Sequence, residues 1–134
     1  DEQTNKQRLS SMIKNILLVG LGGGIGSMLR YLSQRMADKL YTIHFPWGTF
    51  SVNIIGCFLI GIFWGISFKS FETNENWKLF LMTGLCGGFT TFSAFTLEGI
   101  GLLKEQKIAL FFLYVAGSLL IGLAATYLGM KLSR

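Results

Sequence analysis

Four long apolar runs alternate with short polar segments along the chain. The runs cover residues 13–32, 45–67, 77–103 and 108–130, and most charged residues lie between them. About 20 apolar residues suffice for a helix to cross the hydrocarbon core of a bilayer, and every run is at least that long. The pattern therefore predicts an all-α membrane protein with four transmembrane helices.

The polar segment at residues 1–11 precedes the first run, and we expect it to be a disordered tail. Residues 12–134 then form one four-helix transmembrane domain. The composition agrees with this organisation, because 51% of the residues are hydrophobic and the mean hydropathy is +0.49. Such values indicate a multi-pass membrane protein rather than a soluble domain.

The third run contains a stretch, from Thr83 to Glu98, that is a poor helix. Its glycines and hydroxyl side chains are Gly84, Gly87, Gly88, Thr90, Thr91, Ser93 and Thr96. Glycine lowers helix stability, and hydroxyl groups compete for backbone hydrogen bonds. A straight helix over the whole run would measure roughly 40 Å, which is too long for one untilted crossing. We therefore predict a break at residues 87–91 that frees backbone groups for an ion; a flexible, closely packed helix is the alternative.

Three phenylalanines follow these glycines at intervals of three residues. Phe89, Phe92 and Phe95 are therefore expected on one face of a helix. Such a face is typical either of a pore lining or of ordinary helix packing. From the spacing alone, ordinary packing is the simpler interpretation.

Polar side chains recur at a four-residue spacing inside two other runs. Thr49 and Asn53 share one face of the second run, and Tyr114 and Ser118 share one face of the fourth. A buried amide is costly unless it has a partner, so Asn53 either joins two helices or donates to an anion. Arg30, near the end of the first run, is either an interfacial side chain or a charge on a transport pathway, and the interfacial position is the simpler interpretation.

The first run is rich in glycine and contains the small-residue pairs Gly20/Gly24 and Gly22/Gly26. Such pairs permit close packing of helices in lipid. A dinucleotide-binding loop is the alternative for this stretch, but Ile25 stands where that fingerprint needs glycine or alanine. Close packing is therefore the better interpretation.

Charged and reactive residues exclude several classes of function. The net charge is +5, but the basic residues are scattered between the runs, so no basic stripe offers a nucleic-acid site. Cys57 and Cys86 lie inside apolar runs without a CxxC motif, which is typical of small buried hydrophobic residues. His44, the only histidine, has no neighbours suited to metal binding. No set of nucleophile and base is visible, so we expect that the chain is not an enzyme.

Lysine and arginine residues near the membrane are almost balanced between its two sides. The side of the termini has Lys14, Lys69, Lys78, Lys131 and Arg134, and the other side has Arg35, Lys39, Lys104 and Lys107. Adding Lys6 and Arg8 favours termini in the cytoplasm, but the membrane-proximal difference is too small to fix an orientation. Insertion both ways round would let two antiparallel copies assemble about a two-fold axis in the membrane plane.

The runs carry motifs that resemble the Fluc-type (CrcB-like) fluoride channels of bacteria and archaea. The motifs are GGGIGSMLRY, WGTFSVNIIG, GLCGGFTTFSAFTLE and Tyr114-xxx-Ser118, one in each run. The resemblance implies an antiparallel, dual-topology homodimer in the inner (plasma) membrane. It also implies a passive channel that exports fluoride from the cytoplasm and so confers fluoride resistance.

The same resemblance implies a set of site residues. The fluoride pathway would include Arg30, Thr49, Asn53, Phe92, Phe95, Tyr114 and Ser118, and we add Ser93 as a further hydroxyl donor. A structural sodium ion at the dimer centre would be bound by the backbone carbonyls of Gly87 and Thr90 from each subunit. Glu98 matches the acid that follows the phenylalanine motif. Many members have threonine where this chain has Ala94, which weakens the polar side of the pathway and bears on conduction rate rather than fold.

Two other functions also fit four spans. A small multidrug exporter needs a carboxylate within its first span, and the first run here has none. A membrane-assembly protein without transport needs no polar faces, which leaves the pairs Thr49/Asn53 and Tyr114/Ser118 unexplained. The expected partners are therefore a second copy of the chain, fluoride and membrane lipid, with no nucleic acid.

Overall fold

The computed structural model describes residues 1–41, 44–69 and 74–134, and every element in these ranges is helical. Four stretches are long and apolar enough to cross a membrane, which confirms the predicted all-α, four-span architecture. Three of them are single helices: α1 (Glu2–Leu40), α2 (Trp47–Lys69) and α6 (Ile108–Ser133). The other, Glu75–Lys104, consists of α3 (Glu75–Trp77), η1 (Lys78–Cys86), α4 (Gly87–Phe89) and α5 (Phe92–Lys104).

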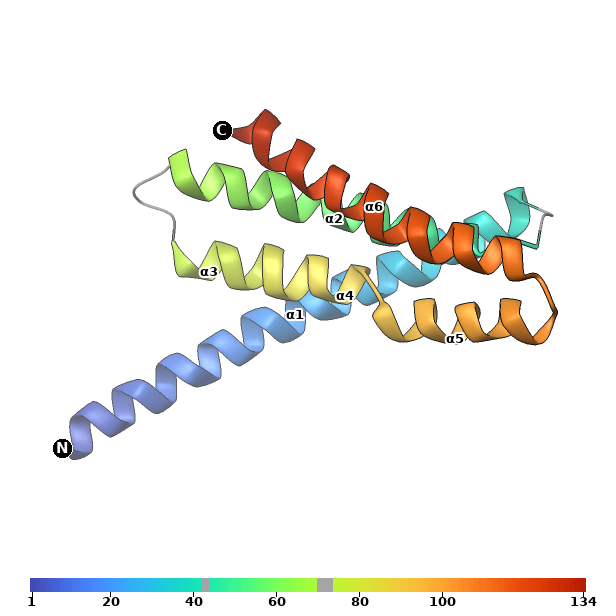
Figure 1. Ribbon diagram of the computed structural model, residues 1–134. Helices are drawn as coiled ribbons and strands as arrows, with labels where there is room; N and C mark the ends of the chain where they lie inside the picture. The colour runs from blue at the N-terminus through green and yellow to red at the C-terminus, as the bar shows by residue number, and fades with distance from the viewer. Residues whose placement is uncertain (42–43, 70–73) are drawn as a thin grey trace.

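Helix α1 is longer than the predicted first span because it includes the N-terminal segment. Residues 2–11, which we expected to be disordered, form the first turns of this 39-residue helix. Residues 1–11 contain no glycine or proline and several good helix formers, so the helix extends without interruption into the apolar run. Figure 1 shows this end of α1 projecting away from the other helices.

Helices α2 and α6 lie side by side along much of their length (Figure 1). Their backbones approach closely at two glycines. A Cβ atom at Gly61 would collide with the carbonyl oxygen of Thr126, and one at Gly129 would collide with the carbonyl oxygen of Phe58. Small residues allow such contacts. In lipid these contacts matter because an apolar side chain gains little free energy when it moves from lipid into a helix interface. Close backbone packing therefore holds this pair together.

Helix α1 packs against η1 and α4 through glycines as well. Gly22 and Gly26 are buried, and a Cβ atom at Gly26 would collide with the carbonyl oxygen of Leu85. Gly20 and Gly24 have open space where their Cβ atoms would lie. Of the two predicted pairs, only Gly22/Gly26 makes the close contact, because residues two positions apart point to different sides of a helix.

The third span is interrupted at Thr90 and Thr91, whose backbone is extended. The π-helix η1 and the short α4 precede this break, and α5 starts afresh at Phe92. The Thr91 hydroxyl accepts a hydrogen bond from the N–H of Ala94 at 3.2 Å and so caps α5. The predicted break is confirmed, and it lies at the C-terminal end of the interval 87–91.

A tight turn joins α5 to α6 and reverses the chain (Figure 1). Gln106 has a φ of 59°, in the left-handed region. Beside it, the Lys107 ammonium group donates to the carboxylate of Glu105 at 2.6 Å. This hydrogen bond, together with the charge of the ammonium group, holds the pKa of Glu105 below its usual range.

Candidate ion pathway

A side chain of α2 holds the break in the third span. Asn53 Nδ2 donates to the carbonyl oxygen of Thr91 at 2.9 Å, and the Thr91 N–H donates to Asn53 Oδ1 at 2.8 Å. An extended residue inside a membrane helix leaves its N–H and C=O without helical partners, and here one amide side chain satisfies both. Asn53 therefore joins two helices, which is one of the two roles that its position in the sequence suggests.

The break also changes the hydrogen bonding of two carbonyl groups. In a continuous helix, the Gly87 carbonyl would accept from the N–H of Thr91. The Thr90 carbonyl would likewise accept from the N–H of Ala94. Here the first N–H donates to Asn53, and the second donates to the Thr91 side chain. The carbonyls of Gly87 and Thr90 have therefore lost their helical donors.

Helix α1 contacts the break through Arg30. Its Nε atom donates to the carbonyl oxygen of Gly88 at 3.0 Å. The two backbones are in contact here, since a Cβ atom at Gly88 would collide with the carbonyl oxygen of Gly23. Helices α1 and α2 therefore each hold a different part of the break.

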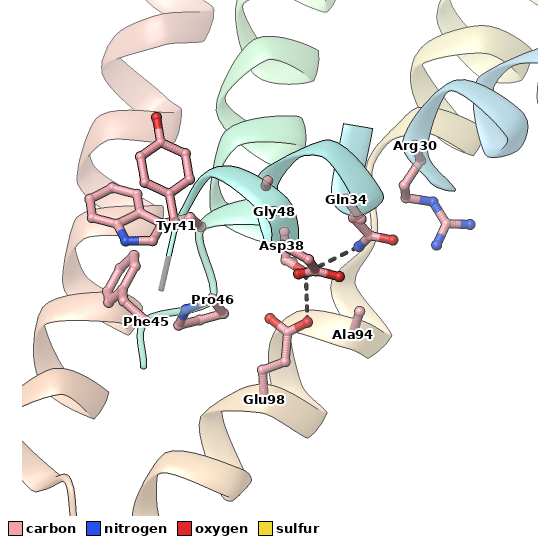
Figure 2. Close-up of a pocket in the computed structure, with 12 residues that line it drawn as sticks. Arg30, Gln34, Asp38, Tyr41, Phe45, Pro46, Gly48, Ala94 and Glu98 are labelled. Atoms are coloured by element: carbon pink, nitrogen blue, oxygen red, sulfur yellow. Dashed lines mark hydrogen bonds between the residues drawn. The ribbon is translucent and has the colours of Figure 1, made fainter. Parts of the chain in front are cut away.

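A carboxylate in α5, that of Glu98, links side chains from three other helices, and Figure 2 shows it on the same side as Gln34 of α1. Thr49 Oγ1 donates to Glu98 Oε1 at 2.6 Å, and the Tyr114 hydroxyl donates to Glu98 Oε2 at 2.9 Å. Gln34 Nε2 donates in turn to Thr49 Oγ1 at 3.2 Å. An amide nitrogen can only donate, so the Thr49 hydroxyl hydrogen is directed to the carboxylate. Thr49 is 2% exposed and Tyr114 is 0% exposed, whereas Gln34 and Glu98 are half-buried and line the neighbouring cavity.

Sequence reasoning found two members of this network but not their common partner. Thr49 and Tyr114 were predicted as pathway residues, whereas Glu98 had no assigned contact and Gln34 was part of a polar connector. The one available signal was the presence of a carboxylate inside an apolar run, where it needs hydrogen-bond donors. The identity of those donors depends on how four helices are arranged, which no local pattern specifies.

A first cavity, with a volume of about 420 Å³, opens beside this network (Figure 2). Its lining residues are Arg30, Gln34, Ala37, Asp38, Tyr41, Phe45, Pro46, Trp47, Gly48, Thr49, Ala94 and Glu98. It therefore combines a guanidinium group with two carboxylates. Ala94 lies in this lining, so the hydroxyl that the family motif would supply is missing from this cavity.

The second cavity, of about 430 Å³, is lined by Asn53, Phe92, Phe95 and Ser118, together with Gly87, Thr90 and mostly apolar neighbours. None of the described residues that line it is charged. The ring centroids of Phe92 and Phe95 lie 5.8 Å apart, and those of Phe95 and Tyr114 lie 5.0 Å apart. Since Tyr114 also reaches Glu98, its side chain connects the linings of the two cavities.

Ser118 is distinctive within the second cavity. Its Oγ atom is buried and has no hydrogen-bond partner in the described part of the chain. Most buried hydroxyl groups in proteins have a partner, because an unpaired one is costly. Ser118 is part of the lining of this cavity, and its hydroxyl group has no described partner that would compete with a ligand.

Phe89 and Ser93 lie outside both cavities. Phe89 precedes the break and is buried near Gly56 of α2. The prediction that three phenylalanines share one helical face is wrong for Phe89, because two extended residues separate it from Phe92. Ser93 is exposed, and its Oγ atom lies 3.3 Å from Thr91 Oγ1.

These features define a class: a multi-pass, all-helical membrane protein whose broken span borders one uncharged and one charged cavity. The chain belongs to the family of CrcB-like proteins (Camphor Resistance, CrcB), which it matches over residues 17–130. That range contains all four sequence motifs, so the resemblance that they carry is confirmed. The protein accordingly belongs in the plasma membrane.

Curated relatives agree with this assignment. The chain is 46% identical over 122 residues to the "Fluoride-specific ion channel FluC" of Flavobacterium psychrophilum. The aligned residues make up 91% of this chain and 98% of the relative. It is 46% identical over 121 residues to the protein of the same name from Phocaeicola vulgatus. The aligned residues make up 90% of this chain and 99% of that relative. A third relative with this name, from Azobacteroides pseudotrichonymphae, is 44% identical over 122 residues, or 91% of this chain and 98% of its own length.

Proposed function

We propose that the chain is a fluoride-selective passive ion channel that exports fluoride from the cytoplasm and so limits fluoride toxicity. The relatives are named as fluoride-specific ion channels, which also supports the expectation that the chain is not an enzyme. The observation that carries the proposal is the second cavity. Asn53, Phe95 and Ser118 come together there from α2, α5 and α6.

The second cavity offers an anion several weak contacts and no fixed positive charge. The edge of an aromatic ring carries partial positive charge, so Phe92 and Phe95 can face an anion without binding it tightly. The Ser118 hydroxyl can donate a hydrogen bond, since no described residue accepts one from it. Asn53 has a second amide hydrogen besides the one that Thr91 accepts. Weak contacts in series let a small anion leave as well as enter.

Glu98 lines the charged cavity, where a bare carboxylate would repel fluoride. Both of its oxygens accept hydrogen bonds, from Thr49 and Tyr114. Charge-assisted hydrogen bonds of this kind offset part of the negative potential. We therefore place the pathway along α5, from Phe95 past Tyr114 to Thr49 and then to Arg30.

Fluoride export needs no separate energy source, because hydrogen fluoride is a weak acid. Neutral HF crosses lipid, dissociates at cytoplasmic pH and leaves fluoride trapped as an anion. A passive pathway for that anion is sufficient to lower its concentration. Proton coupling and ATP hydrolysis are not required.

We further propose an antiparallel homodimer with a structural sodium ion on its two-fold axis. The carbonyls of Gly87 and Thr90 have lost their helical donors, and an unpaired oxygen in a dry interior is costly. Carbonyl oxygens suit a hard cation such as Na⁺, which would hold two breaks together. No close contact within the protomer requires glycine at residue 87, where a Cβ atom would lie 3.9 Å from its nearest neighbour, the carbonyl oxygen of Met82. The approach of an equivalent break from a second copy explains the small residue.

Fluoride efflux from liposomes tests the proposed channel. Purified protein should release fluoride from loaded vesicles, as read by a fluoride electrode, while chloride is retained and no proton is co-transported. Phe92→Ile and Phe95→Ile should reduce efflux strongly without dissociating the dimer. Phe112→Ile is the matched control, since this phenylalanine of α6 is exposed and lines neither of the two cavities. Proton-coupled transport would instead indicate an exporter, and full efflux in both test variants would remove the phenylalanines from the pathway.

A further inference from the structure

Both cysteines of the chain border the second cavity. The sequence contains two cysteines, and both thiols are free. Cys57 lies on α2 and Cys86 ends η1, and each is part of the lining. Sequence reasoning treated them as unrelated buried residues. The fold brings them to the same space as the proposed fluoride contacts.

The surroundings of these thiols are rich in sulfur and poor in charge. Cys86 is 3% exposed, and its side chain lines the same cavity as that of Cys57. Cys57 Sγ packs against Gly122 of α6, where a Cβ atom would lie 3.4 Å from the sulfur. The thioether of Met82 belongs to the same lining. Three soft donor side chains therefore meet in one mostly apolar cavity.

We propose that Cys57 and Cys86 form a two-thiol site for soft metal cations, typified by Hg²⁺, and that an ion bound there closes the fluoride pathway. The closing of the pathway rests on the proposed function, whereas the binding of the metal does not. Thiolate and thioether ligands select soft metals. With HgCl₂, two S–Hg bonds form, the two thiols release two protons to water, and two chloride ions leave. No oxidation state changes.

Charge balance favours Hg²⁺ in the second cavity. Two thiolates neutralise one divalent cation, so the complex carries no net charge into apolar surroundings, where a net charge would be costly. Two sulfur ligands in line satisfy Hg²⁺, whereas Zn²⁺ requires four ligands. Across the described ranges of the chain, no group of three or more His, Cys, Asp or Glu side chains could hold such a metal. The site therefore discriminates against zinc.

The positions of the two cysteines place a bound ion next to the break. Cys57 follows Asn53 by one helical turn, and Thr90 follows Cys86 by one turn. The Thr90 hydroxyl donates to the carbonyl oxygen of Cys86 at 2.9 Å, which ties this part of the cavity wall to the break. An ion that bridges the two sulfur atoms thus spans from α2 to the third span and occupies the space beside Asn53.

Metal retention tests the thiol pair. The full-length protein in detergent is loaded with HgCl₂ and washed with excess monothiol, and bound mercury is measured by elemental mass spectrometry. A two-sulfur chelate survives this wash, so the parent keeps one mercury per protomer. Cys57→Ala and Cys86→Ala lose it, and a dithiol removes it from the parent. Cys57→Ser and Cys86→Ser repeat the test in case an alanine variant fails to fold. Zn²⁺ taken through the same procedure is not retained.

Efflux from liposomes tests the closing of the pathway. After mercury loading and the monothiol wash, parental fluoride efflux should fall at least about tenfold, because a blocked pathway has no second exit. Each cysteine variant is compared with its own mercury-free rate and should keep that rate. A dithiol should restore efflux in the parent.

Several results would overturn the proposal. Mercury retained equally by both single variants would show that the two cysteines do not act as a pair. Retained mercury with unchanged efflux would show that the site does not close the pathway. Block that persists when both cysteines are replaced would place the inhibition elsewhere. If the untreated protein releases no fluoride, the proposed function fails, while the retention measurement still decides whether the two-thiol site exists.

Discussion

Asn53 and Ser118 are both polar residues inside membrane helices, but their hydrogen bonding differs completely. Asn53 exchanges two hydrogen bonds with the backbone of Thr91, so it stabilises the fold. Ser118 Oγ is buried without any partner in the part of the chain that the structure describes. An unpaired buried hydroxyl typically costs about 1–3 kcal/mol. If the hydroxyl group serves the proposed pathway, stability and function make opposite demands at residue 118.

Ser118→Ala should separate these two demands. Removing an unpaired hydroxyl should leave the free energy of unfolding unchanged or raise it by about 1 kcal/mol. Fluoride efflux should nevertheless fall, because the pathway loses a donor. Thermal unfolding in detergent and liposome efflux measure the two effects on the same preparation.

Thr96→Ala is the control for this substitution. Thr96 lies on α5, is exposed and lines neither of the two cavities, and its hydroxyl donates to the carbonyl of Ser93. Its loss should leave efflux unchanged. A Ser118→Ala protein that is much less stable and also less active would contradict the prediction, since that result indicates a structural role.

The helices of this protein meet mainly where glycines let backbones approach. Gly26 faces the carbonyl oxygen of Leu85, whereas Gly24 on the same helix faces open space. Both residues lie in regular α-helix, so their intrinsic helix propensities are equal. The pair therefore separates the contribution of close packing from that of propensity.

Gly24→Ala should stabilise the protein by about 0.5–1 kcal/mol, because alanine loses less backbone entropy in a helix. Gly26→Ala should destabilise it by about 1–3 kcal/mol or more, since the added methyl group forces α1 away from the third span. Chemical denaturation in detergent micelles measures both. Similar effects of the two substitutions would show that α1 does not pack through Gly26.

Some elements were predictable from the sequence because they depend on local properties. Run length predicted the four spans, and the cluster of glycines and hydroxyl side chains predicted the break. The pairing of Asn53 with Thr91 was not predictable, because periodicity specifies the faces of one helix but not the rotation of one helix against another. Phe89 was misplaced for a related reason, since an interruption of the helix changes which residues share a face. Gln34 and Glu98 meet Thr49 only through the packing of three helices.

At the scale of the whole molecule, the membrane-proximal lysine and arginine residues are almost evenly divided between the two sides of the membrane. Orientation in a membrane follows the bias of lysine and arginine in short loops, and the membrane-proximal residues here provide little bias. We therefore expect that a single chain inserts in either direction, as the proposed antiparallel homodimer requires.

Reporter fusions test the orientation. A C-terminal reporter that is active only in the cytoplasm and one that is active only outside should both give signal in cells. Adding three lysines after Arg134 should shift the signal towards the cytoplasmic reporter, because it creates the missing bias. Signal from one reporter alone in the parent would exclude dual topology.

Sodium dependence tests the proposed cation site. The lifetime of the dimer in detergent should be longer in sodium than in a large organic cation, because Na⁺ would bind carbonyls of both subunits. Gly87→Leu should abolish the difference, since its side chain occupies the space between the breaks. Thr90→Val should keep most of it, because the carbonyl remains. Sodium current through the parent protein would contradict a structural role, and so would a dimer lifetime independent of sodium.

The hydrogen bonds around Thr90 and Thr91 have a consequence for the kinetics of assembly. Asn53 and Arg30 fix the break within one protomer, so the chain loses this conformational freedom when it folds rather than when it meets a ligand or partner. Preorganised sites bind with a smaller entropic penalty than sites that must be ordered on contact. The rate of dimer formation should therefore be set by diffusion and alignment of two chains in the plane of the bilayer. No slow rearrangement of the third span needs to precede it.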